Sequence, residues 1–281
     1  MSMNQAEWTI RPVMRTVSQS IVEAWQNRRL FGYFARECRK LVTRRTSLGN
    51  FWLVSRPVSH FLPHLLLFGY VLRFETEMPF PVYFMAGMLM WYPFDQVWFW
   101  SSRGIDANRK ILQKLYFPRI ILPVSHCIIG LIDILIVGML FIGTVFVFWI
   151  LTGYIYVPLR WELLWAPLAM MVALGLALGL GLFFCVWAAH SRDAIFSIRI
   201  ILQAWYLLTP IAYPSDLLLA RAPLLAYVNP LFGPISVFRD ALLGGEVHPL
   251  LLVYPAVLTT IVLLLGLRFF SLYERDTIDM V

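Results

Sequence analysis

Few side chains in this sequence are arranged as a reactive centre would require. His60 and His64 are one helical turn apart, a spacing that suits two ligands of one metal ion, but no third ligand is near them in the sequence. We therefore interpret them as packing or channel-lining residues. None of the three lysines, Lys40, Lys110 and Lys114, follows a glycine-rich loop of the kind that cradles a nucleotide phosphate. The sequence accordingly predicts neither a metal site nor a catalytic site, and no cofactor bound by this chain.

The most distinctive polar feature is the segment 108–119, which lies between two long apolar stretches. It contains four basic residues and no acidic residue, and the step Phe117-Pro118 lies near its end. Charged side chains cost about 2.5–3.5 kcal/mol each at the centre of a bilayer, so we expect the segment on the cytoplasmic face, where a soluble partner can push on it. The residues expected to couple the chain to that partner are Asn108, Arg109, Lys110, Lys114, Phe117, Pro118 and Arg119.

The composition indicates a membrane protein. Hydrophobic residues make up 60% of the chain and charged residues 14%, and the mean hydropathy is +0.72, which is too apolar for a soluble domain of this length. The apolar runs are continuous, which favours helices over a membrane β-barrel with its alternating strands. The net charge of +7 does not indicate a nucleic-acid partner, because membrane topology explains it better.

Crossing the hydrocarbon core takes about 20 apolar residues, and six stretches of the sequence qualify. We predict an all-α polytopic protein whose transmembrane helices lie within residues 51–72, 79–100, 120–150, 163–189, 194–213 and 249–267. The glycines of the fourth stretch, Gly175, Gly179 and Gly181, predict close packing against a neighbouring helix. The expected organisation is a cytoplasmic N-terminal segment over 1–49, a transmembrane domain over 50–270 that includes the loop 101–119, and a cytoplasmic tail over 271–281.

Lysine and arginine counts predict that both termini are cytoplasmic. The N-terminal segment holds nine of these residues, the loop from Ser101 to Arg119 five, the turn near Arg192 two and the tail two, which makes 18 on one side. The opposite connections hold four, and one arginine, Arg56, falls within a span. Because positive loops stay in the cytoplasm, the richer side is the cytoplasmic one.

Two segments are apolar without being spans. Residues 30–45 alternate apolar and basic faces at helical spacing, which predicts an amphipathic interface helix lying at the membrane surface, where it contacts lipid headgroups. Whether its polar face also docks a cytoplasmic subunit is left open. Residues 215–245 are broken by Pro223 and Pro230, and we expect two short re-entrant helices that dip into the outer leaflet and meet at Asn229-Pro230.

Four ionisable residues, Arg56, Asp95, Asp133 and Arg199, fall inside apolar stretches, where they are costly. Two interpretations of Arg56 remain. It faces a water-filled path for an anionic substrate, or it lies near the cytoplasmic end of its span and extends to water or pairs within a dimer; we prefer the second. Asp133 lies centrally enough to require a partner, which the sequence does not name.

Several short sequence motifs follow one another along the chain in a particular order and spacing. They are Thr46-Ser-Leu-Gly49 with Trp52 and Pro57, Asn108 and Lys114 with Phe117-Pro118-Arg119 and Leu122-Pro123, Arg192-Asp193, Pro210-Ile-Ala-Tyr-Pro214, Asn229-Pro230 and Phe269-Phe270. With these phrases the chain resembles the transmembrane permease subunits of type-2 ABC exporters, in the branch that moves lipid-linked polysaccharides such as O-antigen, capsule or teichoic acid. It departs from them in Arg56, where the family has an uncharged polar residue, and in an N-terminal extension of about 25 residues.

The resemblance implies a particular assembly in the inner membrane. Two copies of the permease form a homodimer with two copies of a separate ABC ATPase subunit, which carries the ATP and Mg. The amphipathic helix and the loop around Asn108 to Arg119 then form the contact with that subunit. The implied substrate is a lipid-linked polysaccharide, and the resemblance leaves open whether periplasmic export proteins also bind.

A polymer of polar sugars needs a continuous route, which we expect between the first and fifth spans at the interface of two copies. Aromatic residues are dense in what we take to be the outer half of the second and fifth spans. An interfacial aromatic belt explains such residues in general, but sugar rings also pack their C–H faces on aromatic rings. The residues expected along the path are Arg56, His60, Trp91, Phe94, Trp98, Arg199, Trp205 and Tyr206.

Two alternatives stand beside this interpretation. One is a type-2 exporter of the same family for a drug or a small lipid. The other is a polytopic membrane glycosyl- or acyltransferase that acts on lipid-linked substrates. Such an enzyme needs paired acids or a catalytic histidine in a loop outside the membrane, and the outer loops offer only scattered acids and His248.

Overall fold

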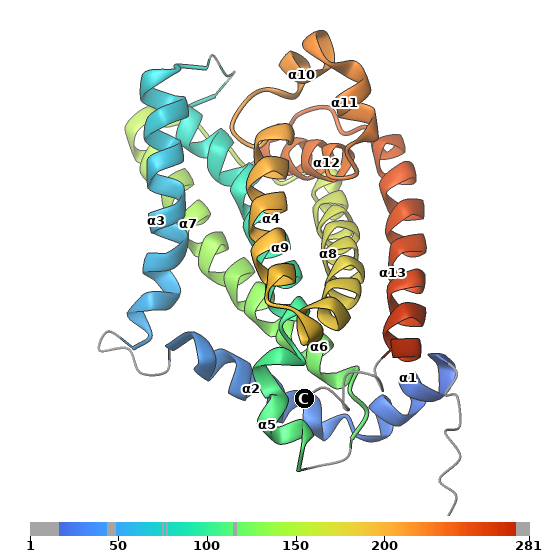
Figure 1. The fold of residues 1–281 in the computed structure, drawn as a ribbon. Helices are drawn as coiled ribbons and strands as arrows, with labels where there is room; N and C mark the ends of the chain where they lie inside the picture. The colour runs from blue at the N-terminus through green and yellow to red at the C-terminus, as the bar shows by residue number, and fades with distance from the viewer. Residues whose placement is uncertain (1–16, 44–48, 75, 77, 115–116, 274–281) are drawn as a thin grey trace, which may run out of the picture.

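The computed structural model of the chain describes residues 17–43, 49–74, 76, 78–114 and 117–273. These residues form helices joined by turns and loops, and they contain no strand (Figure 1), which confirms the all-α prediction. Some predicted features lie outside the described residues. They are residues 1–16 of the N-terminal segment, Arg44, Arg45 and the phrase 46–48, the acids Glu75 and Glu77, and the tail from residue 274.

Each of the six predicted apolar stretches coincides with helical structure. In chain order these helices are α3 (Phe51–Leu65) with the π-helical η1 (Leu66–Val71), α4 (Phe80–Ser102), α6 (Ile121–His126) with α7 (Ile128–Thr152), α8 (Trp165–His190), α9 (Asp193–Leu208) and α13 (Val253–Tyr273). Within the described part of the chain, three helical runs are long and apolar enough to cross a membrane: Ile121–Thr152, Trp161–His190 and Pro249–Tyr273. The other three are shorter, as in α3 and α9 with 15 and 16 residues, or rich in Trp and Tyr, as in α4.

The first apolar stretch is not one regular helix. Pro57 and Pro63 lie inside α3, where a proline cannot donate a backbone hydrogen bond, and the chain changes to π-helical geometry at Leu66. After η1, Arg73 has a positive φ of 48°, which is uncommon for a residue with a Cβ atom. This turn ends the helical run and sets the direction of Phe74, the residue that follows.

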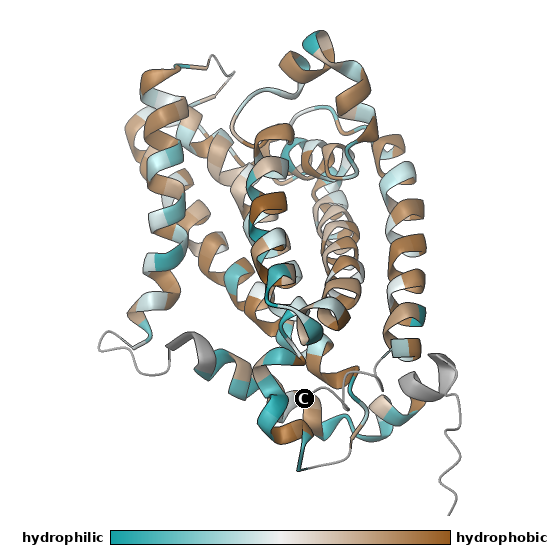
Figure 2. Cartoon of the chain, in the orientation of Figure 1, coloured by the Kyte–Doolittle hydropathy of each residue, from teal (hydrophilic) through white to brown (hydrophobic). Residues whose placement is uncertain are grey.

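Helix α4 is the centre of the bundle. It contacts α6, α7, α8, α9 and α12, and side chains on all of its faces are buried, among them Phe84, Met88 and Phe94. A helix that is apolar all round is expected in such a position. The helices around it expose large apolar side chains, such as Leu135 and Met139 of α7, and Figure 2 shows apolar residues along the whole bundle. The outer surface of the bundle is therefore suited to lipid.

Glycines allow α8 and α13 to approach each other closely. A Cβ atom added to Gly179 would lie 3.0 Å from the backbone of Leu263, and one added to Gly266 would lie 2.6 Å from the carbonyl oxygen of Gly179. At Gly175, an added Cβ would lie 2.9 Å from the side chain of Thr259 on α13. The predicted role of the glycines in the fourth stretch is thus confirmed, since small residues let two helices pack backbone to backbone.

Hydrophilic residues, among them arginines and lysines, gather at one end of the bundle, which we call the basic end (Figure 2). It contains α1 (Val17–Gln26), α2 (Arg29–Thr43), η2 (Asp106–Asn108) and α5 (Arg109–Leu112). Helix α2 confirms the predicted amphipathic helix, because it buries Phe34 and Cys38 and exposes Arg36 and Arg39. Helix α1 was not predicted; it contacts α13 and buries Ala24.

The opposite end, which we call the α10 end, differs from the prediction in one respect. Three short helices replace the expected two: α10 (Ser215–Arg221), α11 (Pro223–Val228) and α12 (Phe232–Leu243), flanked by η3 (Trp161–Leu164) and η4 (Pro249–Leu252). The additional break is at Ala222, which leaves helical geometry with φ −148° and ψ 66° before Pro223, because a residue before proline disfavours the α conformation. Gly244, with φ 81°, ends α12.

The close approach of α8 and α13 makes a stability prediction. Changing Gly266→Ala places a methyl group against the backbone of α8, and we expect a loss of about 1–3 kcal/mol, the usual cost of overpacking. The matched control is Gly143→Ala on α7, where an added Cβ meets nothing within 4 Å. Thermal unfolding of both purified variants in detergent measures the difference. Equal midpoints for the two variants would contradict the packing.

Candidate coupling and translocation sites

Asn108 anchors the loop at the basic end. Its side chain is buried, and its Nδ2 donates a hydrogen bond to the carbonyl oxygen of Gly104 at 2.8 Å and lies 3.4 Å from Nε2 of His126. His126 is itself buried in α6, where its Nδ1 lies 2.8 Å from the carbonyl oxygen of Leu122. Asn108 therefore joins the end of α4 to α6 across the loop, and it does not face a partner directly.

Arg109 joins the same loop to the end of α8. Its Nη2 donates a hydrogen bond to the carbonyl oxygen of Ala189 at 2.6 Å, and its Nε donates to Oδ1 of Asp106 at 3.1 Å. The last carbonyl groups of a helix lack intrahelical donors and carry partial negative charge, so a guanidinium is well placed there. The loop is thus tied to the end of α8 by a charged hydrogen bond.

Phe117 joins the loop to the amphipathic helix. Its ring stacks on the ring of Phe34 in α2, with centroids 4.9 Å apart, and both side chains are buried. The two segments that the sequence predicted for one partner therefore lie together. Pro118 is also buried, whereas Lys110 and Lys114 are exposed. The two lysines are the residues of the predicted coupling set that remain most open to a partner, and Arg119 is half-buried.

An ion pair inside the bundle connects α3 to α7. Nη2 of Arg56 is 2.8 Å from Oδ1 and 3.0 Å from Oδ2 of Asp133. The Asp133 side chain is fully buried and that of Arg56 is 25% exposed. This pair provides the partner that Asp133 requires. It also corrects our preferred interpretation of Arg56, which pairs within its own chain because α7 brings a buried carboxylate to it.

The predicted aromatic residues of α4 and α9 form one cluster. Ring centroids are 5.6 Å apart for Trp91 and Tyr206, 5.6 Å for Phe94 and Trp205, and 5.7 Å for Trp98 and Trp205. All except Trp205 are buried, so in a single chain these rings pack on one another. The cluster is not confined to one half of the bundle as predicted, since Trp98 lies four residues before the end of α4 that leads into the basic loop.

The two other predicted path residues are exposed beside this cluster. The ring of His60 in α3 lies 6.1 Å from that of Tyr206 and 5.9 Å from that of Tyr92, a contact the sequence did not indicate. The guanidinium of Arg199 in α9 lies 3.6 Å from the ring centroid of Phe99, a cation–π contact. The structure therefore brings α3, α4 and α9 together at these rings.

Asn229 ties the aromatic cluster to the short helices of the α10 end. Nε1 of Trp205 donates a hydrogen bond to Oδ1 of Asn229 at 2.9 Å, and Nδ2 of Asn229 donates to Oγ1 of Thr209 at 2.9 Å. Oδ1 also accepts from the backbone N–H of Leu231 at 3.0 Å. The sequence showed Asn229 as part of an Asn-Pro phrase, but the partner on α9 could not be inferred from it.

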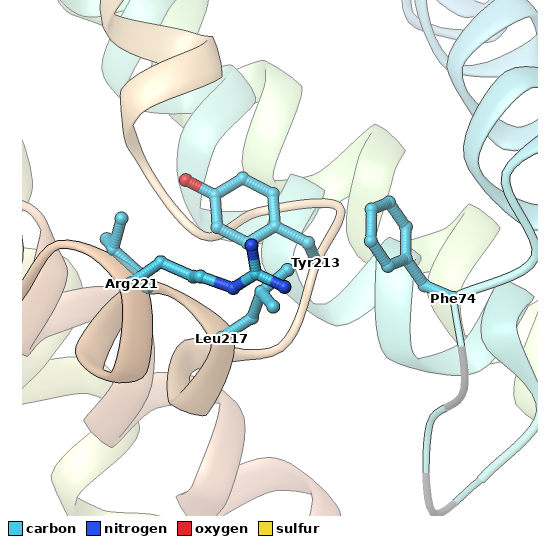
Figure 3. Close-up of a pocket in the computed structure, with 5 residues that line it drawn as sticks. Phe74, Tyr213, Leu217 and Arg221 are labelled. Carbon is cyan, nitrogen blue, oxygen red and sulfur yellow. The ribbon is translucent and has the colours of Figure 1, made fainter.

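A pocket of about 450 Å³ opens at the α10 end. It lies between Phe74, three residues after η1, and helix α10, and Figure 3 shows its side chains. The sequence did not predict it, because its two walls come from segments far apart in the chain. Its lining residues are Phe74, Tyr213, Leu217, Leu218 and Arg221.

These features define an integral membrane protein: an all-helical bundle with an apolar outer surface, an internal ion pair and one basic end. The model of the ABC-2 type transporter family matches residues 29–243, and the chain belongs to this family. Its members are membrane transport subunits whose ATPase is carried by a partner chain.

Relatives align with most of the chain. The polysialic acid transport protein KpsM of Escherichia coli is 26% identical over 84% of this chain and 91% of its own length. The O-antigen export system permease protein RfbA of Myxococcus xanthus is 27% identical over 77% of this chain and 81% of its own length. A protein of the same name from Klebsiella pneumoniae is 24% identical over 74% and 78% of the two chains.

The Arg56–Asp133 pair makes a prediction about charge burial. Changing Arg56→Met leaves the buried carboxylate without a cation, and we expect a loss of about 3–5 kcal/mol of stability. The double variant Arg56→Met with Asp133→Leu removes both charges and should recover most of that loss. Thermal unfolding in lipid nanodiscs compares the native chain, each single variant and the double variant. Additive losses in the double variant would show that the two side chains act independently.

Proposed function

We propose that this chain is the membrane-spanning subunit of an ATP-driven exporter that moves a lipid-linked polysaccharide across the cytoplasmic membrane. One observation carries the proposal. Two relatives named for polysialic acid transport and O-antigen export align with 84% and 77% of the chain. Alignments of this length must include most of the helical bundle. The cluster of aromatic rings between α4 and α9 agrees with it, because such rings offer flat apolar faces to sugars.

The proposed topology has six spans and two cytoplasmic termini. The spans are α3 with η1, α4, α6 with α7, α8, α9 and α13. The basic end then faces the cytoplasm, in keeping with the predominance of lysine and arginine on that side of the sequence. Helices α10 to α12 form the re-entrant segment of the outer leaflet. Asn229 supports this position, since its amide group is satisfied inside the protein by Trp205 and Thr209.

The proposed coupling surface combines α2 with the loop of α5. Stacking of Phe34 on Phe117 makes the two segments one unit, and the exposed Lys110 and Lys114 present their charges to the ATPase. Arg109 connects this unit to the end of α8 through Ala189. Because α8 packs along α13 and α4, a push from the ATPase reaches the middle of the bundle through the loop.

The proposed path lies between two copies of the chain, each of which binds one ATPase subunit. Helices α3 and α9 face the path with His60, Arg199 and Trp205. In one chain the buried rings of the cluster are closed on one another, so transport requires α3 to move relative to α9. The Arg56–Asp133 pair restrains that motion, because α3 cannot leave α7 without exposing a carboxylate to lipid.

Deletion of the gene tests the proposed function. In a cell that makes a surface polysaccharide, we expect the polymer to disappear from the surface and to accumulate within the cell, on the cytoplasmic side of the membrane. A plasmid copy of the native gene should restore export. Normal surface polysaccharide in the deletion strain would contradict the proposal, and so would loss of polymer synthesis without intracellular accumulation.

The same strain tests the path. A double variant with Trp205→Ala and Tyr206→Ala should reduce export by about tenfold or more, because we expect the passing sugars to pack on these two rings. Insertion of the chain into the membrane and formation of the dimer should not change. The matched control is Trp149→Ala, an exposed tryptophan of α7. Surface polysaccharide and the amount of chain in the membrane are measured together. Full export by the double variant would return both residues to a packing role.

Crosslinking tests the coupling surface. In a chain whose native cysteines are replaced, single cysteines at Lys110, Lys114 and Arg36 should form disulfides or short crosslinks with the ATPase partner in the active complex. The control is a cysteine at Tyr154, an exposed residue of the loop that follows α7, which we expect on the opposite side of the membrane. Crosslinks from Tyr154 alone would reverse the proposed sidedness, and no crosslinks from the three basic-end sites would remove the coupling assignment.

A further inference from the structure

The pocket at the α10 end has a lining that the proposed path does not use. Phe74 forms one wall, and Tyr213, Leu217, Leu218 and Arg221 form the other. Figure 3 shows the guanidinium of Arg221 beside the ring of Tyr213 and above Leu217, with the ring of Phe74 across the open space. The volume of about 450 Å³ lies within the range of small-molecule sites, roughly 300–1,000 Å³. Two flat rings and one cation therefore line an open depression of a size that suits a ligand.

Arg221 supplies the charge of the pocket. It is exposed at the end of α10, and it makes no hydrogen bond or ion pair with the residues that the structure describes. A guanidinium presents a planar set of donors that matches the two oxygens of a carboxylate or a phosphate. Asp216, at the start of the same helix, is exposed and is not among the lining residues. The described residues of the lining thus carry a net positive charge, which favours an anionic ligand.

A row of rings connects the pocket with the aromatic cluster. The centroid distances are 4.8 Å from Tyr206 to His64, 6.4 Å from His64 to Phe68 and 6.0 Å from Phe68 to Phe74. Phe74 in turn lies 6.4 Å from Tyr213. Two of these rings belong to η1 and the turn after it: Phe68 lies in the π-helix, and Phe74 follows Arg73, the residue with positive φ. The pocket is therefore at the far end of a continuous aromatic surface.

Phe74 and Tyr213 are held in place by the backbone around them. The backbone N–H of Phe74 donates to the carbonyl oxygen of Phe68 at 3.4 Å, and the hydroxyl of Tyr213 donates to the carbonyl oxygen of Leu207 at 3.1 Å. The carbonyl oxygen of Tyr213 accepts a hydrogen bond from the hydroxyl of Tyr83 in α4 at 3.2 Å. Binding of a ligand against the two rings thus requires little ordering of the walls.

We propose that this pocket binds an anionic sugar, one that carries a carboxylate or phosphate group, as the polymer leaves the path. Arg221 pairs with the anionic group, and the rings of Phe74 and Tyr213 pack against the C–H faces of the sugar. The source of the ligand rests on the proposed function, whereas its chemistry rests on the lining alone. A phosphate of a lipid headgroup shares part of that chemistry, so the experiment must distinguish the two sources.

Binding of defined oligosaccharides tests the site. The full chain, in nanodiscs of phosphatidylcholine, is titrated with hexagalacturonate and with the neutral maltohexaose at low ionic strength. We expect Arg221→Gln to lower the affinity for hexagalacturonate about fivefold, the order expected for one exposed charge pair. Arg221→Lys should retain most of that affinity. The affinity for maltohexaose should not change in Arg221→Gln, whereas Phe74→Ala should lower the affinity for both sugars.

The matched control is Arg160→Gln, which removes a second exposed arginine at the same end, one that donates to the carbonyl oxygen of Gly244 at 3.1 Å. Its hexagalacturonate affinity should equal that of the native chain. Equal affinities in Arg221→Gln and the native chain would overturn the proposal, and so would equal losses in the two glutamine variants. Size-exclusion profiles and unfolding midpoints show whether each variant is folded.

A lipid arm separates the two sources of the anion. Native mass spectrometry counts the phosphatidylglycerol molecules that remain bound to the native chain and to Arg221→Gln. Loss of a bound phosphatidylglycerol in the variant would assign the pocket to a headgroup and overturn the sugar proposal, whereas an unchanged count supports it. The deletion assay is independent: Arg221-dependent sugar binding without an export defect in the deletion strain would retain the pocket and reject the proposed function.

Discussion

The Arg56–Asp133 ion pair is the contact on which the position of α3 depends. Much of the surface of α3 is exposed; it packs on α2, α4 and α7, and it meets α9 through the rings of His60 and His64. Asp133 is fully buried in α7, and an unpaired carboxylate at that depth is far more costly than a paired one. The pair therefore brings α3 to α7. With α3 in place, His60 and His64 reach Tyr206, and the turn after η1 places Phe74 opposite α10.

At both ends of the bundle, polar side chains hold loops and short helices in place through hydrogen bonds. At the basic end, Arg109 binds the carbonyl oxygen of Ala189 near the end of α8, and Asn108 binds that of Gly104 just after α4. At the α10 end, Asn229 holds Trp205 of α9, and Arg239 donates to the carbonyl oxygen of Pro210 at 3.0 Å. Arg109, Asn108 and Arg239 bind backbone carbonyl groups at or just beyond a helix end, whereas Asn229 binds the side chain of Trp205. Such contacts let short helices and loops pack in an apolar setting, and they make each loop move with a particular helix.

Helix positions could be predicted from the sequence because apolar runs and basic flanks act locally. The runs of α7, α8 and α13, the amphipathic α2 and the glycines of α8 all follow from composition and spacing. The misses are local: a π-helix after Pro63, a third short helix before Pro223, and α1 in a segment without a clear apolar run. The same pattern identified the aromatic residues of α4 and α9, but it did not predict that their rings are buried against one another.

By itself, the sequence determined that the chain is an all-helical membrane protein, where its helices lie, and which residues carry charge and aromatic rings. These properties depend on side-chain type and on spacings of three or four residues. Only the tertiary structure decided that Asp133 pairs with Arg56, 77 residues away in the chain, that Phe117 stacks on Phe34, and that Phe74 meets α10 across a pocket. The physical reason is that apolar helices can pack in many arrangements of similar energy, and the sequence pattern does not name neighbours. The few polar groups and the glycines that permit close contact select one arrangement.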